Sequence, residues 1–245
     1  MFPNETDPVI HEEGQGLRAG HGYVTVFEDE GRYRMYHGVG RGYRTDHARR
    51  GVYYAESDDG FEWHRPELGL CEFQGNTANN ILYDASQFGF QSVFVDPSAP
   101  AAERYKAIDS NVNYYRDGAL VSSAQQNRTE IGEIRKAMEL EGYAPDQIDA
   151  KAEIRHVVRG AVSPDGLSWT LLEEPLLDVG KTLLDTQNIA AYDEDTGQYL
   201  AFLRGNVERR RSLRRTGGSE FGHWDDTRIV LTADPQDPPN VDFYN

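Results

Sequence analysis

Cysteine is almost absent from this sequence of 245 residues, in which Cys71 stands alone. A single cysteine excludes a disulfide framework and offers no metal-ligand spacing, so we expect Cys71 to be a small buried or half-buried side chain. No stretch approaches the roughly 20 apolar residues of a membrane-spanning helix, and residues 1–14 lack the basic and apolar regions of a signal peptide. The residues given predict a soluble chain and leave its compartment open.

Positive charge is also scarce, with 25 Lys and Arg against 41 Asp and Glu and a formal net charge of -16. Nucleic acids and anionic membranes require a basic footprint, so this balance argues against both as general partners. Apolar residues are plentiful, because 38% of the chain is hydrophobic and 11% is aromatic. A chain of this length and composition can bury a substantial core.

One short pattern, Ser-x-Asp-Gly-x-x-Trp, occurs twice, as SDDGFEW at residues 57–63 and as SPDGLSW at residues 163–169. Alternating apolar strands precede each copy, and Asp-Gly supplies the positive-φ turn into the next strand. A third copy is looser, with Ser219-Glu220-Phe221 in place of the Asp-Gly turn and with Trp224 retained. The repeated unit is typical of a four-stranded antiparallel meander.

Repeated four-stranded meanders predict an all-β fold, a β-propeller whose blades stack radially. We expect the Trp of each unit to fill the gap between neighbouring blades, since an aromatic side chain can bury about 150–250 Å². The expected blades cover residues 20–67, 88–175 and 185–232 of a single domain, residues 1–245, and a fourth blade begins at 240–245. Because three blades leave open faces, we expect either a longer protein or a homo-oligomer that covers the open blade edges.

Residues 127–152 depart from the β pattern. Ile131, Ile134 and Met138 recur there at helical spacing, and Gly142 is a stop signal. The spacing predicts a helical hairpin inserted between the second and third strands of the second blade.

The antiparallel meander also predicts which loops lie together. Turns between strands 1 and 2 and between strands 3 and 4 lie at one face of a propeller, and the 2–3 loops and blade connections lie at the other. The long polar segments, including RGNVERRRSLRR at residues 204–215, fall at the second face. Binding sites usually lie on such loops, so we expect the functional site there.

Asp185 begins the innermost strand of the third blade, which places its carboxylate at the mouth of the expected central channel. The simpler alternative is that Asp185 only caps a turn. Glu12 and Glu13 precede the first inner strand and Asp242 a fourth, although each alone is more simply a solvated carboxylate. Arginine forks suit carboxylates and sulfates and can hold catalytic carboxylates ionised. The arginines concentrated at this face are Arg44, Arg49, Arg204, Arg209, Arg210, Arg211 and Arg214.

The chain resembles the five-bladed propeller glycosidases near glycoside hydrolase families 32 and 43, and most closely a family-32-like branch. The segments that carry the likeness are YVTVFEDEGRYRMYHG, VYYAESDDGFEWHRPELGL, DPSAPAAERYKAI, SPDGLSW, LDTQNIAAYDEDTGQYLAFLR and RRSLRRTGGSEFGHW. Leu184-Asp185-Thr186-Gln187-Asn188 is similar to the Phe-Asp-Ser-Gln-Asn of that branch. The resemblance implies a glycoside hydrolase acting on a carbohydrate, and we expect neither a cofactor nor a metal.

Glycoside hydrolysis needs two carboxyl groups, about 5–5.5 Å apart for retention of configuration or about 6.5–9.5 Å apart for inversion. On the resemblance, Asp185 acts as nucleophile, base or transition-state stabiliser, Glu13 is its opposite number, and Glu208 is a substitute acid. The residues expected to contact sugar hydroxyls or an anionic substituent are His21, Arg44, Gln187, Asn188, Arg204, Arg209 and Asp242.

Two other interpretations stay open. Glu13-Gly14 lacks the preceding Trp of the related branch, and Phe88-Gly89-Phe90 stands where that branch has His-Asn-Phe. A catalytically inactive propeller that binds a saccharide or a protein through the same face is therefore the main rival. An anion or nucleic-acid binder built on the arginines is the third, and the net charge disfavours it.

Overall fold

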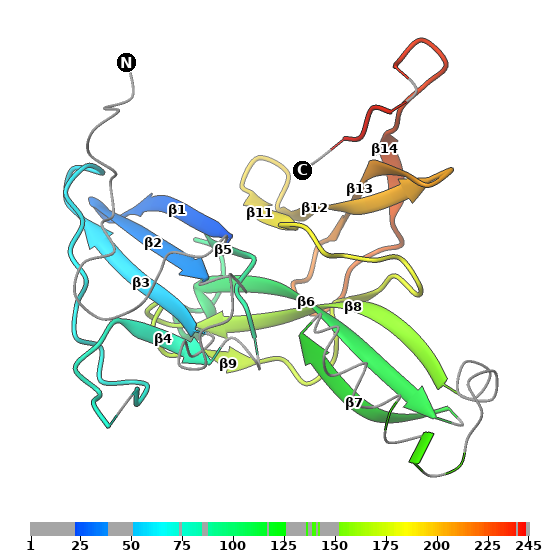
Figure 1. Cartoon of the computed structure of the whole chain (residues 1–245). Helices are drawn as coiled ribbons and strands as arrows, with labels where there is room; N and C mark the ends of the chain where they lie inside the picture. The colour runs from blue at the N-terminus through cyan, green and yellow to red at the C-terminus, as the bar shows by residue number, and fades with distance from the viewer. Residues whose placement is uncertain are drawn as a thin grey trace. The chain divides into compact units, whose positions relative to one another are not determined.

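The computed structural model describes residues 23–38, 51–73, 75–84, 88–116, 118–125, 136, 139–140, 142, 152–238 and 240–243. The elements defined in these residues are strands β1 to β14 and one short 3-10 helix, Ala101–Glu103 (Figure 1). The chain divides into two compact units, residues 1–91 and residues 92–245, which are described separately. Within the described part of the chain, no helix is long and apolar enough to cross a membrane.

The first unit contains one antiparallel sheet with the strand order β1-β2-β3-β4. These strands are Val24–Asp29, Arg32–Gly38, Gly51–Ser57 and Ile81–Asp84. The middle of the sheet is aromatic, with Tyr36 stacked on Phe27 and in edge contact with Tyr54. The fourth strand is β4, so the sheet extends beyond the predicted blade limit at residue 67. Before that limit, the chain pairs with β3 only through one isolated bridge, between His64 and Glu56.

The second unit contains two antiparallel sheets. The first has the strand order β5-β6-β8-β10, and β7 pairs with β6 and β9 with β8 outside this order. The second has the order β11-β12-β13-β14. The strands of the first of these sheets are Ser92–Val95, Tyr105–Arg116, Ala119–Gln125, Ala152–Ser163, Thr170–Leu171 and Leu177–Asp178. Those of the other are Ile189–Asp193, Gln198–Val207, Arg210–Gly218 and Arg228–Leu231.

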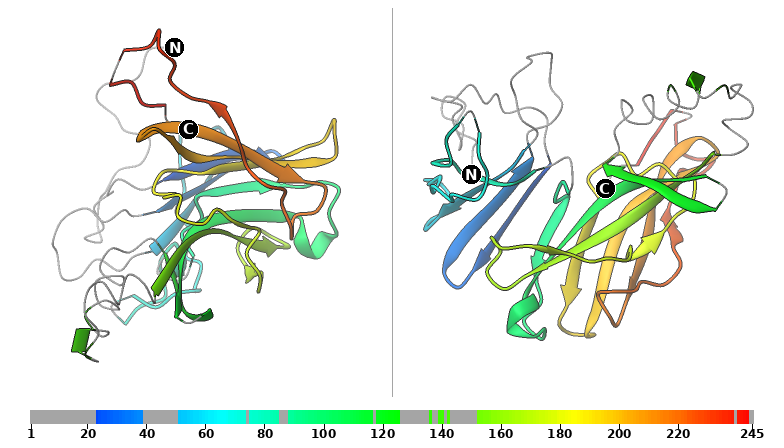
Figure 2. Two further views of the ribbon diagram at one scale, coloured as in Figure 1. Left: turned by 90° about the vertical axis from the view of Figure 1, so that its right-hand side faces the viewer. Right: turned by 90° about the horizontal axis from the view of Figure 1, so that it is seen from below.

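The two sheets of the second unit pack face to face (Figure 2). Their inner strands β5 and β11 are joined at Ser92, whose hydroxyl donates to the carbonyl of Ala190 at 3.2 Å and accepts from its amide at 3.1 Å. The apolar side chains between the sheets are Phe94, Ile108, Val158, Val162, Leu176, Leu177, Leu184, Ala190, Tyr199, Ala201, Leu203, Phe221 and Trp224. The fold is therefore all-β and built from antiparallel blades of four strands in order, as predicted, with β7 and β9 added to the blade β5-β6-β8-β10.

The two copies of the Ser-x-Asp-Gly-x-x-Trp motif have the same local structure. In each, the serine hydroxyl accepts from the glycine amide at 2.9 Å, and the aspartate accepts from two backbone amides. Trp63 and Trp169 donate their indole N–H groups to the glycine carbonyls of their own turns. Both indoles are half-buried. The prediction that each Trp fills an interblade gap is confirmed for Trp224, which is 2% exposed between the sheets of the second unit, and stays a prediction for Trp63 and Trp169.

The predicted helical hairpin at residues 127–152 is not supported. Most of that segment lies outside the described residues, and the elements on either side of it are strands. Strand β6 continues to Arg116, turns at Gly118 and returns as β7, while β8 pairs with β6 from Ala152 onward. Of the described residues within the segment, Lys136, Glu139 and Leu140 are helical, but they define no helical element.

The connection between β12 and β13 also differs from the prediction of a long loop over residues 204–215. The two strands pair as far as Val207 and Arg210, and only Glu208 and Arg209 form the turn. Both turn residues have positive φ, 49° and 69°, as a two-residue type I′ hairpin requires. This polar segment is therefore a β-hairpin. The prediction of a loop was wrong because exposed strand positions accept arginine as readily as loops do.

Candidate functional site

The strand directions of the third blade bring several predicted site residues to one end of the sheet. Strand β11 begins, β12 ends and β13 begins at this end, because neighbours in the sheet are antiparallel. The residues there include Asp185 before β11, the turn at Glu208 and Arg209, and Asp242 beside β13. We call this region the connection end of the third blade. The predicted grouping of the blade connection and the 2–3 turn at one face is confirmed for this blade.

Asp185 forms an ion pair at this end of the blade. Leu184 is fully buried in the core between the sheets, so the next residue, Asp185, emerges at the surface with its side chain 36% exposed. Arg204 of β12 forms an ion pair with it through Nη1 and Oδ1, and the arginine side chain is only 11% exposed. An adjacent guanidinium favours the ionised form of a carboxylate. The ion pair therefore fixes the position of the Asp185 carboxylate just before β11, and the pair as a whole is neutral.

Asn188 holds the backbone that carries Asp185. Its amide nitrogen donates to the carbonyls of Leu184 and Thr186, each at 3.1 Å, and its oxygen accepts from the amide of Arg204 at 3.0 Å. The residue is 1% exposed. Asn188 thus acts within the protein, fixing the turn before β11 against β12, and its amide is not presented to a ligand.

The preceding blade contributes His156, which lies on β8 and faces the third blade. It is 7% exposed. Burial and, to a smaller extent, the positive charge of Arg204 lower the pKa of His156 below the ordinary value of 6.5. A neutral imidazole has one donor and one acceptor nitrogen. Ser110 of β6 supports the same region by donating to the carbonyl of Leu184 at 3.1 Å.

The other described candidates are more widely spread. Gln187 is half-buried, and Glu208 and Arg209 are exposed at the tip of the β12–β13 turn. Asp242 accepts a hydrogen bond from the amide of Arg211 at 2.9 Å, on the β14 side of β13. Strands β12 and β13 therefore separate Asp242 from β11, and the structure does not bring its carboxylate to Asp185.

The predicted residues Glu12, Glu13, His21, Arg44 and Arg49 lie outside the described residues, so their roles stay predictions. Of the residues that the structure places, no group of three or more His, Cys, Asp and Glu side chains could hold a metal ion. Sequence reasoning missed His156, because it stands in an apolar strand with no motif around it, in the segment Ile154 to Val158.

The comparisons with known proteins give weak structural likenesses. The sequence matches no family model and no curated protein. A glycosyl hydrolase from Bacteroides ovatus aligns at 11% identity and a TM-score of 0.44, over 94% of this chain and 58% of its own. An N-acetylgalactosamine deacetylase from F. plautii, in complex with blood group B trisaccharide, aligns at 14% identity and a TM-score of 0.41, over 87% of this chain and 54% of its own.

A sucrose-6-phosphate hydrolase from Lactobacillus gasseri aligns at 9% identity and a TM-score of 0.37, over 80% of this chain and 31% of its own. This chain therefore spans less than two thirds of the length of each of these three structures. At such identities and TM-scores, none of them assigns an activity or a residue role to this chain.

Proposed function

We propose that this chain is part of a carbohydrate-active enzyme that cleaves a glycosidic bond at the connection end of its blades, with Asp185 as one of the two carboxyl groups. The observation that carries the proposal is an ion pair between Asp185, which lies just before β11, and the nearly buried Arg204 of β12. It adds a physical role to a residue within the segment that resembles the propeller glycosidases of families 32 and 43.

The pair suits one half of the chemistry. An ionised carboxylate can attack the anomeric carbon, activate a water or stabilise the oxocarbenium-like transition state, but it cannot protonate the leaving group. The acid must then be a second carboxyl group, for which Glu13 is the first candidate and Glu208 the second. Because Asp185 already balances the charge of Arg204, an anionic substituent of the substrate would fall to Arg209.

The rival function is a propeller that binds a saccharide at the same end without cleaving it. It is favoured by the tight β12–β13 turn, which places Glu208 at an exposed tip instead of in an enclosed pocket. Binding alone needs neither an acid nor a second carboxylate at a fixed distance. The two functions make different predictions for the same variant.

The test is a hydrolysis and binding screen over pooled glycosides with the wild type, Asp185→Asn and the control Asp195→Asn. Asp195 is an exposed carboxylate in the turn at the opposite end of the same blade. We expect Asp185→Asn to lower turnover by orders of magnitude, since uncatalysed glycoside hydrolysis is very slow. The control should be unaffected. Loss of the ion pair should cost about 1–3 kcal/mol of unfolding free energy, because Asp185 is partly exposed but Arg204, which loses its partner, is nearly buried.

Three outcomes would contradict the proposal. Turnover that survives in Asp185→Asn places the catalytic carboxylates elsewhere. Saccharide binding by the wild type with no hydrolysis of any bound glycoside supports the inactive binder. Unfolding of Asp185→Asn, with Asp195→Asn intact, means that Asp185 is a structural cap.

A further inference from the structure

Two arginines stand directly opposite each other on β13 and β14. Arg215 and Arg228 are paired in the register of these antiparallel strands. Residues directly opposite in an antiparallel pair project from the same face of the sheet, and like charges at such positions are destabilising. Arg215 is half-buried and Arg228 is exposed. The position therefore concentrates two positive charges at one point of an otherwise acidic chain.

Neither guanidinium is neutralised by another of the residues that the structure places. The ion pairs found there join other arginines, such as Arg155 and Arg204, to carboxylates. The charge of Arg215 does act on Asp193. The pKa of Asp193 is lowered mainly by a hydrogen bond from Thr196, and the charge of Arg215 is the smallest of the causes. That effect leaves Arg215 without a direct carboxylate contact. A third, anionic group between the two arginines would remove the repulsion.

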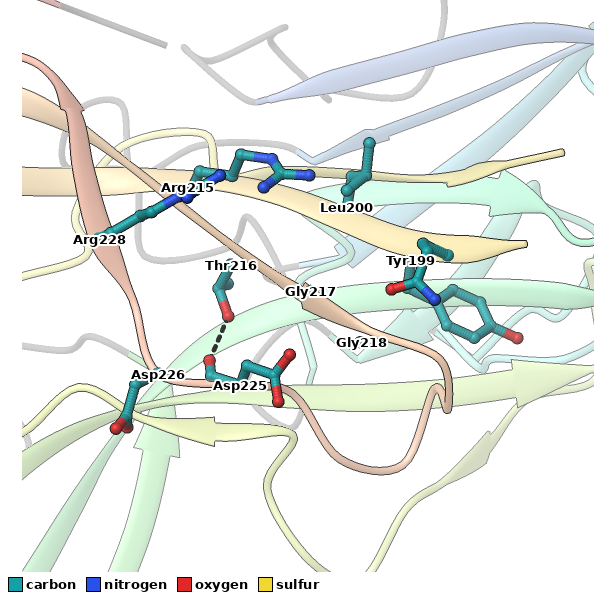
Figure 3. Close-up of a pocket in the computed structure, with 10 residues that line it drawn as sticks. Tyr199, Leu200, Arg215, Thr216, Gly217, Gly218, Asp225, Asp226 and Arg228 are labelled. Atoms are coloured by element: carbon teal, nitrogen blue, oxygen red, sulfur yellow. Dashed lines mark hydrogen bonds between the residues drawn. The ribbon is translucent and has the colours of Figure 1, made fainter. Parts of the chain in front are cut away.

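The two arginines line a pocket of about 290 Å³. Arg215 and Arg228 lie on one side of it, and the loop that carries Asp225 and Asp226 lies on the other (Figure 3). This loop is held to β13 by hydrogen bonds, from the amide of Asp225 to the carbonyl of Gly217 and from Thr216 to the carbonyl of Asp225. The pocket is therefore lined by two cationic side chains and by a loop whose backbone is held in place by hydrogen bonds.

The pocket lies at the other end of β12 from the candidate catalytic residues. It is lined by Gln198, Tyr199 and Leu200 at the start of β12, whereas Arg204 lies near the end of that strand. Its lining includes neither Asp185 nor His156. Whatever binds here does so independently of the proposed catalytic pair.

We propose that this pocket binds the oxyanion group of a small ligand, a carboxylate, sulfate or phosphate, between Arg215 and Arg228. Two planar guanidinium forks offer several N–H donors to such a group, which is the geometry that oxyanions accept best. Asp225 and Asp226 also line the pocket, and their charges disfavour a ligand that is anionic throughout. The mixed lining favours a ligand with one oxyanion beside uncharged hydroxyl groups, such as an acidic or sulfated monosaccharide.

The experiment measures the dissociation constants of glucuronate, glucose 6-sulfate, glucose 6-phosphate and glucose by calorimetry at fixed ionic strength. The wild type is compared with Arg215→Gln, Arg228→Gln and Asp226→Asn. The matched control is Arg210→Gln, which removes the same charge from the other end of β13. We expect the three anionic sugars to bind and glucose not to bind. Each pocket arginine variant should weaken binding about tenfold, the loss typical of one charged hydrogen bond.

The Asp226→Asn variant tests how the negative charges of the pocket affect binding. Asp226→Asn should tighten the binding of the anionic sugars, because it removes a repulsive charge without changing the shape of the side chain. Preference among glucuronate, the sulfate and the phosphate identifies the oxyanion. Inorganic sulfate at the same concentration shows whether the sugar hydroxyls contribute.

The proposal is overturned if the anionic sugars bind no better than glucose. It is equally overturned if Arg210→Gln weakens binding as much as Arg215→Gln and Arg228→Gln do, since the effect would then be one of net charge. Variants that fail to fold would be recognised by their melting temperatures. For Arg228→Gln we expect no loss of melting temperature without ligand, because the substitution relieves a like-charge pair.

Discussion

Tyr199→Phe should destabilise the packing of the second and third blades by removing one hydrogen bond and nothing else. The phenol of Tyr199, which is 6% exposed, donates to Oδ2 of Asp96, which is 1% exposed in the loop after β5. The ring itself packs against Phe94, Phe221 and Tyr192 and keeps those contacts in the variant. A hydrogen bond to a charged group typically contributes about 1.5–3 kcal/mol.

The expected loss is therefore about 2 kcal/mol of unfolding free energy at neutral pH. For a unit of this size, that corresponds to a fall in melting temperature of about 4–8 °C. The matched control is Tyr192→Phe, which removes a hydroxyl that is hydrogen-bonded to the Ser98 hydroxyl at 2.9 Å in an exposed position. A neutral, exposed hydrogen bond should contribute less than about 1 kcal/mol. Urea unfolding followed by circular dichroism measures both.

The pH dependence of the Tyr199→Phe effect provides an independent check. Burial raises the pKa of Asp96, but hydrogen bonds from Ser98 and Tyr199 and the charge of Lys106 outweigh it, so the pKa lies below the ordinary 3.8. A carboxyl group with a lowered pKa stabilises the fold at pH values above its unfolded pKa, and this contribution is lost as the pH falls through the folded pKa. The difference between wild type and variant should therefore narrow below about pH 4. Equal losses in the two tyrosine variants, or a difference that does not change on acidification, would refute the reasoning.

Two further predictions concern single residues. Gly217→Ala should cost about 3 kcal/mol or more, because an added Cβ would lie 1.8 Å from the carbonyl oxygen of Tyr199, whereas Gly222→Ala, with nothing within 4 Å, should be nearly neutral in the same urea titration. His156 should titrate below 6.5 in proton NMR, and Arg204→Gln should raise its pKa only in part, because burial is the larger cause; full recovery of the ordinary value would contradict that order.

The parts of the fold that sequence predicted are those with strong local rules. Asp59-Gly60 and Asp165-Gly166 specify their turns through glycine's positive φ, 77° and 78°, and through hydrogen bonds within the turn, so the repeat and the antiparallel order could be predicted. The hydrogen bond from the indole N–H of Trp169 to the carbonyl of Gly166 could not be predicted, because the sequence spacing is the same whether or not the indole bonds to its own turn.

The candidate site was predictable to a similar extent. Asp185 and Arg204 are 19 positions apart, and only the fold, in which β12 returns beside β11, brings their side chains together. Sequence supplied the carboxylate through its motif-like surroundings, but gave no signal for its partner among several arginines. The structural role of Asn188 was also hidden, since an amide next to a candidate catalytic residue looks the same whether it faces a ligand or its own backbone. Glu208 and Arg209 were expected in a long loop because strand and loop positions at the surface have the same polar composition.

The division of the outer strand into short pieces has a consequence for solubility. In the second blade, β9 and β10 have two residues each, and Pro175 lies between them. Such short edges cannot template the addition of a strand from another chain, and proline lacks the amide that the pairing would need. In the third blade, β14 is continuous, and its consecutive residues Ile229, Val230 and Leu231 are 39%, 42% and 44% exposed. Of these outer strands, β14 is therefore the one at which unwanted sheet extension between molecules would begin, and a charged residue at Val230 is the change that would block it.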